Sequence, residues 1–543
     1  MVPGKIGRAF QMNDMTHQTV FERFRWAAGR WPDRPMLNVL PETAGIYGIA
    51  AGETSYAQAF GTVETLAQGF RASGFGPGHR VGLLLQNRPE FLWHWLALNA
   101  CGASIVPINP DLRAAELTYL IEHSEMVLAI SIPDRCDDLR AAAPGLTVVA
   151  PGDTIGAVPP VTGNSGADAE CALLYTSGTT GRPKGCMLSN FYFLNTGDWY
   201  AGVGDALSVH TDPPERMLTP LPLFHVNALV FSVMGMMTAG GCLSVLDRFH
   251  PATWWDSVRA CDATIIHYLG IMPPLLMKQP EGPGDRDHKV RLGFGAGIDP
   301  ALHVAAEERF GFPHVEGWAM TETGAGGVIM ATAEPRNPGT ANFGQPRDGV
   351  EARIVLDDGS EAGIDEPGEL LVRRAGPDPR RGFFSGYLKN SQATDEAWQG
   401  GWLNTGDIVL RDANGNFRFV DRKKNIVRRS GENISAAEVE SILLQRADIR
   451  NLAVAPAPDD VRGEEVMALI IAEGDRDAGQ AEAITRWALD QMAYYKAPGW
   501  IAFVDALPVT ATEKIQRGEI RTLVSDLLAR GNAHDLRALK RRG

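Results

Sequence analysis

Residues 175–185 constrain this chain more than any other segment, and they read Tyr-Thr-Ser-Gly-Thr-Thr-Gly-Arg-Pro-Lys-Gly. The apolar run 171–175 in front of them predicts a buried strand that leads into a loop. Glycines let such a loop turn several backbone N–H groups toward one anion, and the hydroxyls and the ammonium add further donors. The sequence therefore predicts a phosphate-binding loop, whose ligands are Thr176, Ser177, Gly178, Thr179, Thr180, Gly181 and Lys184.

Two other interpretations of this loop are weaker. A P-loop NTPase is disfavoured, because Pro183 stands five residues after Gly178, where a P-loop has Gly and Lys. A plain Gly/Ser/Thr-rich surface loop is the other alternative. The preceding strand, the density of hydroxyls and the Pro-Lys-Gly ending favour phosphate binding over it.

Composition limits the class of protein. A chain of 543 residues is too long for one ordinary core, and 44% hydrophobic with 21% charged residues is typical of a globular protein with two or more domains. The net charge of −14 disfavours nucleic-acid partners and anionic membranes, which both require a basic surface. Any phosphate site must therefore be local, and the expected partners are small molecules.

Cysteine usage and the termini point to a cytoplasmic protein. The six cysteines show no C-x-x-C spacing and none lies beyond Cys261, which favours core filler in a reducing compartment over disulfides or zinc. The first residues lack the apolar stretch of a signal peptide. Polar residues and Gly240-Gly241 interrupt the apolar stretch 228–246, so we expect a buried helix, a turn and a strand at 242–246 and no transmembrane segment.

Strand and helix patterns alternate through the first 350 residues. A strand at 81–85, a helix at 89–101 and a strand at 103–108 form a βαβ unit. Further strands are expected at 172–175, 242–246 and 264–268. We therefore predict an α/β fold, with a large N-terminal domain of mostly parallel sheets covered by helices.

The pattern changes toward the C-terminus. Short strands between Gly, Asp and Asn turns are expected at 351–356, 369–373 and 416–420, which indicates a β subdomain. A capping box of Ser435 and Glu438 begins a helix. With strands at 451–455, 466–472 and 500–504 and a helix at 481–492, a small mobile α+β domain is expected. The predicted division is 1–420, a hinge at 421–424, and 425–543.

The loop at 175–185 resembles the AMP-binding signature of the adenylate-forming superfamily, and the family's other motifs follow in order from Pro222 to Lys514. The resemblance covers nearly the whole chain and implies an AMP-forming acyl-CoA ligase. Such an enzyme uses ATP, Mg²⁺ and coenzyme A to convert a carboxylate into an acyl-AMP and then into a thioester. A weaker resemblance is to the crotonobetaine/carnitine-CoA ligase branch.

The resemblance also implies roles for residues in the middle of the chain. Trp318 would lie against adenine, Glu322 with Thr179 would hold Mg²⁺, and Thr321 would bond a phosphate or hydroxyl. The segment around them, which includes Gly317 and Met320, departs from the family at Ala319, where a glycine is usual. The small residues Gly295, Ala296 and Gly297 would border the adenine and the acyl group; Ile298 excludes a Rossmann fingerprint there.

Further implied roles lie near the C-terminus. Asp407 and Arg422 would bind the ribose, and Lys424 would be the pivot of the C-terminal domain. Arg428 and Gly431 would line the thioester-forming face, where Ser430 replaces a usual glycine. Lys514, together with Thr180, Lys184 and Glu322, would be catalytic; Glu513 stands where the family has glycine. By pattern alone, the basic run 422–429 is also compatible with a solvated face.

The acyl pocket is expected around His225, Val226, Tyr268, Gly270 and Gly295. A histidine between apolar residues is also compatible with a core position, so a pocket role for His225 is one of two alternatives. An aryl or branched aliphatic acid fits as well as a zwitterionic one. Two rival functions also stay open, a stand-alone enzyme that loads a carrier-protein phosphopantetheine and a non-catalytic ATP-binding protein. A homodimer is left open too.

Overall fold

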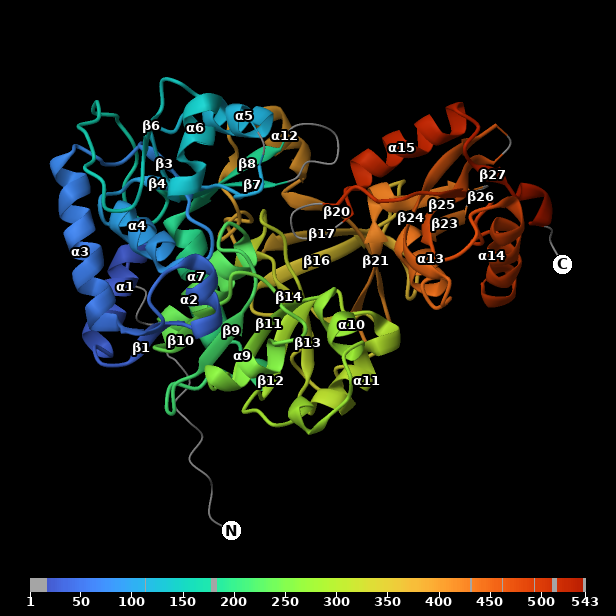
Figure 1. Ribbon diagram of the computed structural model, residues 1–543, viewed down its shortest axis with the longest axis horizontal. Coiled ribbons are helices and arrows are strands. Elements are labelled where there is room, and N and C mark those ends of the chain that lie inside the picture. The colour runs from blue at the N-terminus through green and yellow to red at the C-terminus, as the bar shows by residue number, and fades with distance from the viewer. Residues whose placement is uncertain are drawn as a thin grey trace, which may run out of the picture. The chain divides into compact units, whose positions relative to one another are not determined.

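The computed structural model describes residues 17–112, 114–176, 183–429, 432–460, 462–492, 494–509 and 515–540 (Figure 1). By its internal contacts the chain divides into two compact units. The larger comprises Pro183–Ala352, Val372–Leu403 and the described residues before Ser177. The smaller comprises Arg353–Leu371 and the described residues from Asn404 onward.

One sheet of the larger unit is parallel except at its two edges. Its interior pairs are all parallel, and only β2 and β14 run antiparallel to their neighbours. The strand order is β14 (Ile329–Met330), β13 (His314–Trp318), β12 (Leu292–Ala296), β11 (Ile265–Leu269), β9 (Arg216–Thr219), β10 (Cys242–Val245), β1 (Pro35–Val39) and β2 (Gly52–Ser55).

A second sheet carries the strand before the phosphate-binding loop. Its β3–β4, β3–β5, β4–β7 and β5–β6 pairs are parallel, whereas β8 runs antiparallel to both β7 and β18. The order is β18 (Gly386–Tyr387), β8 (Lys184–Ser189), β7 (Glu170–Thr176), β4 (Ser104–Pro107), β3 (Arg80–Leu84), β5 (Leu128–Ser131) and β6 (Thr147–Val149).

Buried helices connect the two sheets. The α4 helix contacts β4 of one sheet, α8 contacts β10 of the other, and α1 contacts both helices. Residues Phe91–Asn99 of α4 and every residue of α8 are buried, as expected for helices that are covered on all sides. The helices are α1 (Val20–Arg30), α2 (Pro41–Tyr47), α3 (Tyr56–Ala72), α4 (Pro89–Ala100), α5 (Ala114–Ser124), α6 (Cys136–Ala142), α7 (Asn190–Gly202), α8 (Val233–Ala239), α9 (Trp254–Ala260), α10 (Met272–Met277), α11 (Pro300–Phe310) and α12 (Ser391–Ala397).

The apolar stretch 228–246 folds largely as its sequence predicts. The α8 helix ends at Gly240, whose φ of 68° is left-handed, and β10 follows. The π-helical segment Asn227–Ser232 in front of α8 was not predicted. Within the described residues, no helix has both the length and the apolar character needed to span a membrane. All six cysteines are free, and five of them are buried.

Most of an antiparallel hairpin belongs to the smaller unit. The strands β20 (Trp402–Arg411) and β21 (Phe417–Arg422) pair with Asp407 opposite Arg422. Next to them, in order, lie β17 (Gly368–Arg374) and β16 (Val350–Val355). The predicted short strands of this region are therefore present. The remaining short strands of the chain are β15 (Asn342–Gly344) and β19 (Trp398–Gln399).

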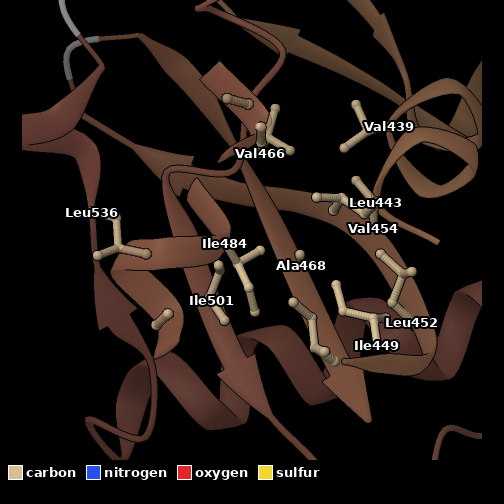
Figure 2. Close-up of a cluster of buried hydrophobic side chains, with 14 of the residues drawn as sticks. Val439, Leu443, Ile449, Leu452, Val454, Val466, Ala468, Ile484, Ile501 and Leu536 are labelled. Atoms are coloured by element: carbon tan, nitrogen blue, oxygen red, sulfur yellow. The ribbon is translucent and has the colours of Figure 1, made fainter. Parts of the chain in front are cut away.

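The C-terminal part of the smaller unit is one sheet with a core on each face. Helices α13 (Ala436–Leu443) and α14 (Ala478–Gln491) cover one face, where Val439, Leu443 and Ile484 pack on the strands (Figure 2). Ile520 and Val524 of α15 (Arg517–Ala529) lie in the core of the other face. The strands are β22 (Ile426–Arg429), β23 (Glu432–Ser435), β24 (Ile449–Asp459), β25 (Gly463–Ala472), β26 (Trp500–Phe503) and β27 (His534–Asp535).

The predicted fold class is thus confirmed: mostly parallel sheets with helices in a large unit, and a smaller α+β unit. Ser435 caps α13 by accepting a hydrogen bond from the Glu438 N–H, as the capping box predicts. The hinge at 421–424 and the domain limits on either side of it stay predictions.

Candidate active site

Two antiparallel strands flank the predicted phosphate-binding segment in sequence. Thr176 at the end of β7 pairs with Lys184 at the start of β8, and its Oγ1 donates to the Lys184 carbonyl oxygen at 3.5 Å. Because a strand and not a helix follows the loop, the local fold differs from a P-loop, in which a helix N-terminus faces the phosphates. The predicted ligands Ser177, Gly178, Thr179, Thr180 and Gly181 lie outside the described residues.

Glu322 lies in the turn that follows β13. Its side chain is buried, and Tyr387 Oη donates to its Oε1 at 2.8 Å. Its backbone is held as well, because the Phe384 N–H donates to the Glu322 carbonyl at 2.9 Å. The turn itself is closed by the Met320 N–H, which donates to Thr323 Oγ1 at 2.8 Å. Tyr192 Oη donates to the neighbouring Thr321 carbonyl at 2.9 Å.

Tyr387 brings two independently predicted residues together. Its hydroxyl binds Glu322, and the Lys184 Nζ lies 4.7 Å from the centroid of its ring. Burial, and then the negative charge of Glu322, raise the pKa of Tyr387 far above its ordinary value. Tyr387 is therefore a neutral hydrogen-bond donor at physiological pH. No motif in the sequence had indicated it.

Among the described residues Glu322 forms no ion pair, although the Lys184 ammonium lies over the ring of Tyr387, which also contacts Glu322. The contacts of Glu322 there are the Tyr387 hydroxyl and the thiol of Cys186, whose pKa is raised by burial and by Glu322 itself. Within the same residues, no group of three metal-binding side chains is present. A Mg²⁺ ion commonly takes one or two carboxylates and completes its shell with phosphate and water oxygens. A single buried carboxylate beside a phosphate loop fits that chemistry.

The small residues at the end of β12 are tightly enclosed. A Cβ on Gly295 would lie 2.4 Å from the Tyr268 carbonyl oxygen, and one on Gly270 would lie 1.8 Å from the Gly297 carbonyl oxygen. No larger residue fits at either position. Gly297 also has a φ of +80°. Ala296 and Gly297 are exposed, so this strand end has an open side.

Glu316, which sequence reasoning missed, holds this strand end in place. The Gly297 N–H donates to its Oε2 at 2.8 Å, and Tyr268 Oη donates to its Oε1 at 2.6 Å. Burial raises the pKa of Glu316, and these hydrogen bonds oppose that effect. The signal was a carboxylate inside the otherwise buried strand His314–Trp318. Tyr268 is itself buried, and its pocket role stays a prediction.

Trp318 and Gly317 end β13. The Trp318 side chain is buried, with its ring centroid 6.3 Å from that of Phe343. A Cβ on Gly317 would lie 2.9 Å from the Phe294 ring, so the glycine lets that ring pack closely. The adenine contact expected of Trp318 stays a prediction.

Two histidines near the predicted acyl pocket differ in environment. His225 is exposed and its ring lies 4.6 Å from that of Phe224, so the alternative of a core position is wrong. Val226 beside it is half-buried. The core histidine is His267, which contacts Tyr200 Oη at 2.7 Å and Ser232 Oγ at 2.8 Å. Burial lowers the pKa of His267 to about 3, so it is neutral.

The smaller unit holds the predicted ribose contacts. Arg422 Nε lies 2.8 Å from Asp407 Oδ1, and the Asp407 side chain is buried whereas that of Arg422 is half-exposed. Arg428 is exposed, and its Nη2 lies 3.1 Å from Asp357 Oδ2. Lys423 Nζ donates to Glu369 Oε2 at 2.7 Å. The basic run therefore has acidic partners within its own unit.

The two remaining predicted residues, Gly431 and Lys514, lie outside the described residues. Their flanks are anchored. Arg429 pairs with Glu432, and these two residues stand on either side of Gly431 in the sequence. Val509 pairs with Ile515 across the segment that contains Lys514, and the Gln516 N–H donates to the Pro508 carbonyl at 2.9 Å.

Comparison with known sequences decides the family. The sequence model of AMP-binding enzymes matches residues 24–388, and that of the AMP-binding enzyme C-terminal domain matches residues 438–514. The chain belongs to the AMP-binding enzyme family. The predicted resemblance to adenylate-forming enzymes is confirmed.

Relatives of this AMP-binding enzyme include CoA ligases with different acids in their names. A sulfoacetate–CoA ligase of Cupriavidus necator is 29% identical over 93% of this chain and 99% of its own length. A feruloyl-CoA synthase of Amycolatopsis sp is 31% identical over 91% of this chain and 98% of its own length. The solved structure of o-succinylbenzoate CoA synthetase from Bacillus subtilis, in complex with an acyl-adenylate intermediate, superposes with a TM-score of 0.78. That protein is 24% identical and is covered to 97%, with 92% of this chain, so its likeness shows the fold.

Proposed function

We propose that this AMP-binding enzyme is an ATP-dependent carboxylate:CoA ligase that forms AMP. The observation that most supports the proposal is that Lys184, the predicted phosphate-binding cation, and Glu322, the predicted metal-binding carboxylate, both contact Tyr387. Family membership supports it, since relatives that match nearly the whole chain are named CoA ligases.

The first half-reaction joins the acid to the nucleotide. A carboxylate oxygen of the acid attacks the α-phosphorus of ATP, a new P–O bond forms, and the bond to the β-phosphate breaks so that pyrophosphate leaves. Thr176, Lys184 and the loop between them bind the phosphates. Glu322, with Thr179, would hold Mg²⁺, which would supply positive charge against the phosphate oxygens during transfer of the adenylyl group. Asp407 and Arg422 bind the ribose.

The second half-reaction transfers the acyl group. The thiol of coenzyme A attacks the carbonyl carbon of the acyl-AMP, its proton is lost, and AMP leaves with the C–O bond electrons. We propose that the smaller unit pivots at 421–424 between the two steps. Lys514 would serve the first step, and Arg428 with Gly431 the second.

The proposal covers a carboxylic acid and does not single out one acid. His225, Val226, Tyr268, Gly270 and Gly295 are the predicted lining of the acyl site, and they are small or apolar apart from the His225 ring and the Tyr268 hydroxyl. The acids in the relatives' names range from a short sulfonate to an aromatic acid. The location in the cytoplasm and a homodimer stay predictions.

A pyrophosphate-release assay tests the proposal. Purified protein with Mg²⁺ and ATP is offered aliphatic, aryl, sulfonated and zwitterionic carboxylates, each with and without coenzyme A. We expect acid-dependent release of pyrophosphate and, with coenzyme A, formation of the thioester. Adenylation that free coenzyme A cannot discharge would favour the carrier-protein alternative, and no exchange of labelled pyrophosphate into ATP with any acid would exclude the ligase.

Substitution of Lys514 should affect the two half-reactions differently. We expect Lys514→Ala to slow adenylation about a hundredfold or more, because a cation is lost from the developing negative charge. Thioester formation from preformed acyl-AMP should change far less. The two rates are measured by pyrophosphate exchange and by single-turnover thioester formation. Equal losses in both would contradict an alternating role for Lys514.

A further inference from the structure

We propose that Tyr387 is the positioning residue that couples the phosphate-binding cation to the metal-binding carboxylate. Its hydroxyl orients Glu322 toward the metal, while its ring holds the Lys184 ammonium beside the phosphates. The inference rests on the proposed function, and it adds a residue to which no motif pointed. Tyr387 lies 65 residues from Glu322 along the chain, so only the fold brings the two together.

The backbone around Tyr387 is fixed to both partners. On one side, Tyr387 is paired with Cys186 of β8, and the Leu388 N–H donates to the Gly185 carbonyl at 2.8 Å. Lys184 is the first residue of that same strand. On the other side, the Phe384 N–H donates to the Glu322 carbonyl at 2.9 Å. One short segment therefore holds the strand of the lysine and the turn of the glutamate.

The direction of the Tyr387 side chain is fixed as well. The ring packs edge-on against Phe384 with centroids 4.8 Å apart, and the backbone N–H of Tyr387 donates to Thr394 Oγ1 at 2.9 Å. Gly386 before it has a φ of +140°, a conformation that an L side chain rarely adopts. The phenol is thus held in place before any ligand binds, which is what preorganisation of a charged site requires.

The chemistry of a tyrosine suits this position. A lysine or arginine here would neutralise Glu322 and compete with a metal ion, whereas a phenol orients the carboxylate and leaves its charge in place. The electron-rich face of the ring attracts the ammonium of Lys184. Tyr387 can therefore contact the Glu322 carboxylate and the Lys184 ammonium at the same time.

Two substitutions at Tyr387 separate the two contacts. Tyr387→Phe removes the hydroxyl and keeps the ring, whereas Tyr387→Leu removes both. Tyr119→Phe is the matched control, because Tyr119 Oη donates to the Pro183 carbonyl at 2.9 Å and so contacts the same loop through a hydroxyl. The readouts are binding constants: Mn²⁺ binding by electron paramagnetic resonance with saturating ATP, and binding of metal-free ATP by calorimetry with EDTA.

We expect Tyr387→Phe to raise the Kd for Mn²⁺ about tenfold, since a hydrogen bond to a charged group is lost, and to leave the Kd for metal-free ATP unchanged. Tyr387→Leu should raise both, the latter about two- to fivefold. Tyr119→Phe should leave the Mn²⁺ constant unchanged.

An unchanged Mn²⁺ constant in Tyr387→Phe would overturn the inference, as would an equal change in Tyr119→Phe. Tyr387→Phe decides the question even if Tyr387→Leu does not fold. Failure of the proposed function is distinguishable, because the unsubstituted protein would then show no acid-dependent pyrophosphate exchange.

Discussion

Two buried glutamates, one in each unit, differ in the charge of the groups that contact their carboxylates. Glu322 of the larger unit and Glu465 of the smaller unit are 8% and 0% exposed. Glu465 has two cations: Arg429 Nε lies 2.9 Å from its Oε2, and the Lys540 ammonium contacts its Oε1. Among the described residues, Glu322 is bound by a phenol and a thiol, both neutral.

The difference is the one expected if Glu465 is a structural carboxylate and Glu322 binds an external cation, as we propose. A buried charge is costly unless it is paired, and Glu465 is paired within its own unit. The Lys540 Nζ also donates to the Tyr495 carbonyl at 3.1 Å, so this cluster ties the C-terminal segment to β25 and β22. Glu322 keeps a negative charge that an external cation can neutralise. Burial alone therefore does not distinguish the two glutamates. The charge of the groups that contact them does.

The largest expected effect is on stability. Glu465→Gln leaves Arg429 and Lys540 buried without their counter-ion, so the free energy of unfolding of the C-terminal sheet should fall by about 3–5 kcal/mol. Amide hydrogen exchange of β25, which lies at the centre of that sheet, measures the change. A loss below about 1 kcal/mol would mean that the cluster is not a stabilising unit.

Glu322→Gln should impair adenylation and leave stability nearly unchanged. We expect adenylation to fall on the order of 10²–10³-fold, since charge that stabilises the transition state is lost with the metal. Stability should change by no more than about 1 kcal/mol, because the amide still accepts the Tyr387 hydrogen bond and no cation is left unpaired. Pyrophosphate exchange and thermal unfolding of the same preparation test both halves. If Glu322→Gln is strongly destabilised but shows normal pyrophosphate exchange, Glu322 is a structural carboxylate and not a metal-binding one.

The smallest expected effect is the contribution of Lys540 to the pH dependence of the free energy of unfolding. Burial lowers the pKa of Lys540 to about 8 from 10.5, with Glu465 opposing this change and Arg429 and Arg462 adding to it. Between these two values the unfolded chain binds more protons than the folded one, so this group makes stability rise with pH. The slope is at most about 1.4 kcal/mol for each step of one in pH.

Lys540→Met removes this dependence. The difference in unfolding free energy between the parent and Lys540→Met, from β25 amide exchange corrected for intrinsic rates, should rise in favour of the parent from pH 8 to pH 10.5. Below pH 8 the difference should be flat. A difference that falls with rising pH would mean that Glu465 holds the Lys540 proton more tightly than burial expels it.

Much of the fold followed from local patterns. The βαβ unit at 81–108, the helix–Gly–strand sequence ending at β10 and the cap at Ser435 are set by periodicity and by residues with special backbone or capping properties. The π-helical segment Asn227–Ser232 has no such local signal, since it extends a helical pattern by a register change that packing stabilises.

The candidate site was predicted only in part. Lys184 and Glu322 carry motifs, and so do Asp407 and Arg422, which the structure pairs at 2.8 Å. Tyr387, Glu316 and His267 act through contacts with residues distant in sequence, and no sequence motif indicated those contacts. A charged or polar residue within an apolar strand, as at Glu316 and His267, was the available signal for two of the three.

By itself the sequence determined which chemical groups are present and in what order: a hydroxyl-rich glycine loop, a lysine, and carboxylates in recognisable motifs. These depend on residue type and short spacing, which local physical chemistry governs. Only the tertiary structure decided that Glu322 contacts a phenol 65 residues away whereas Glu465 contacts a lysine 75 residues away. The reason is physical, because the effective charge of a buried carboxylate depends on which partners the fold brings within a few ångströms of it.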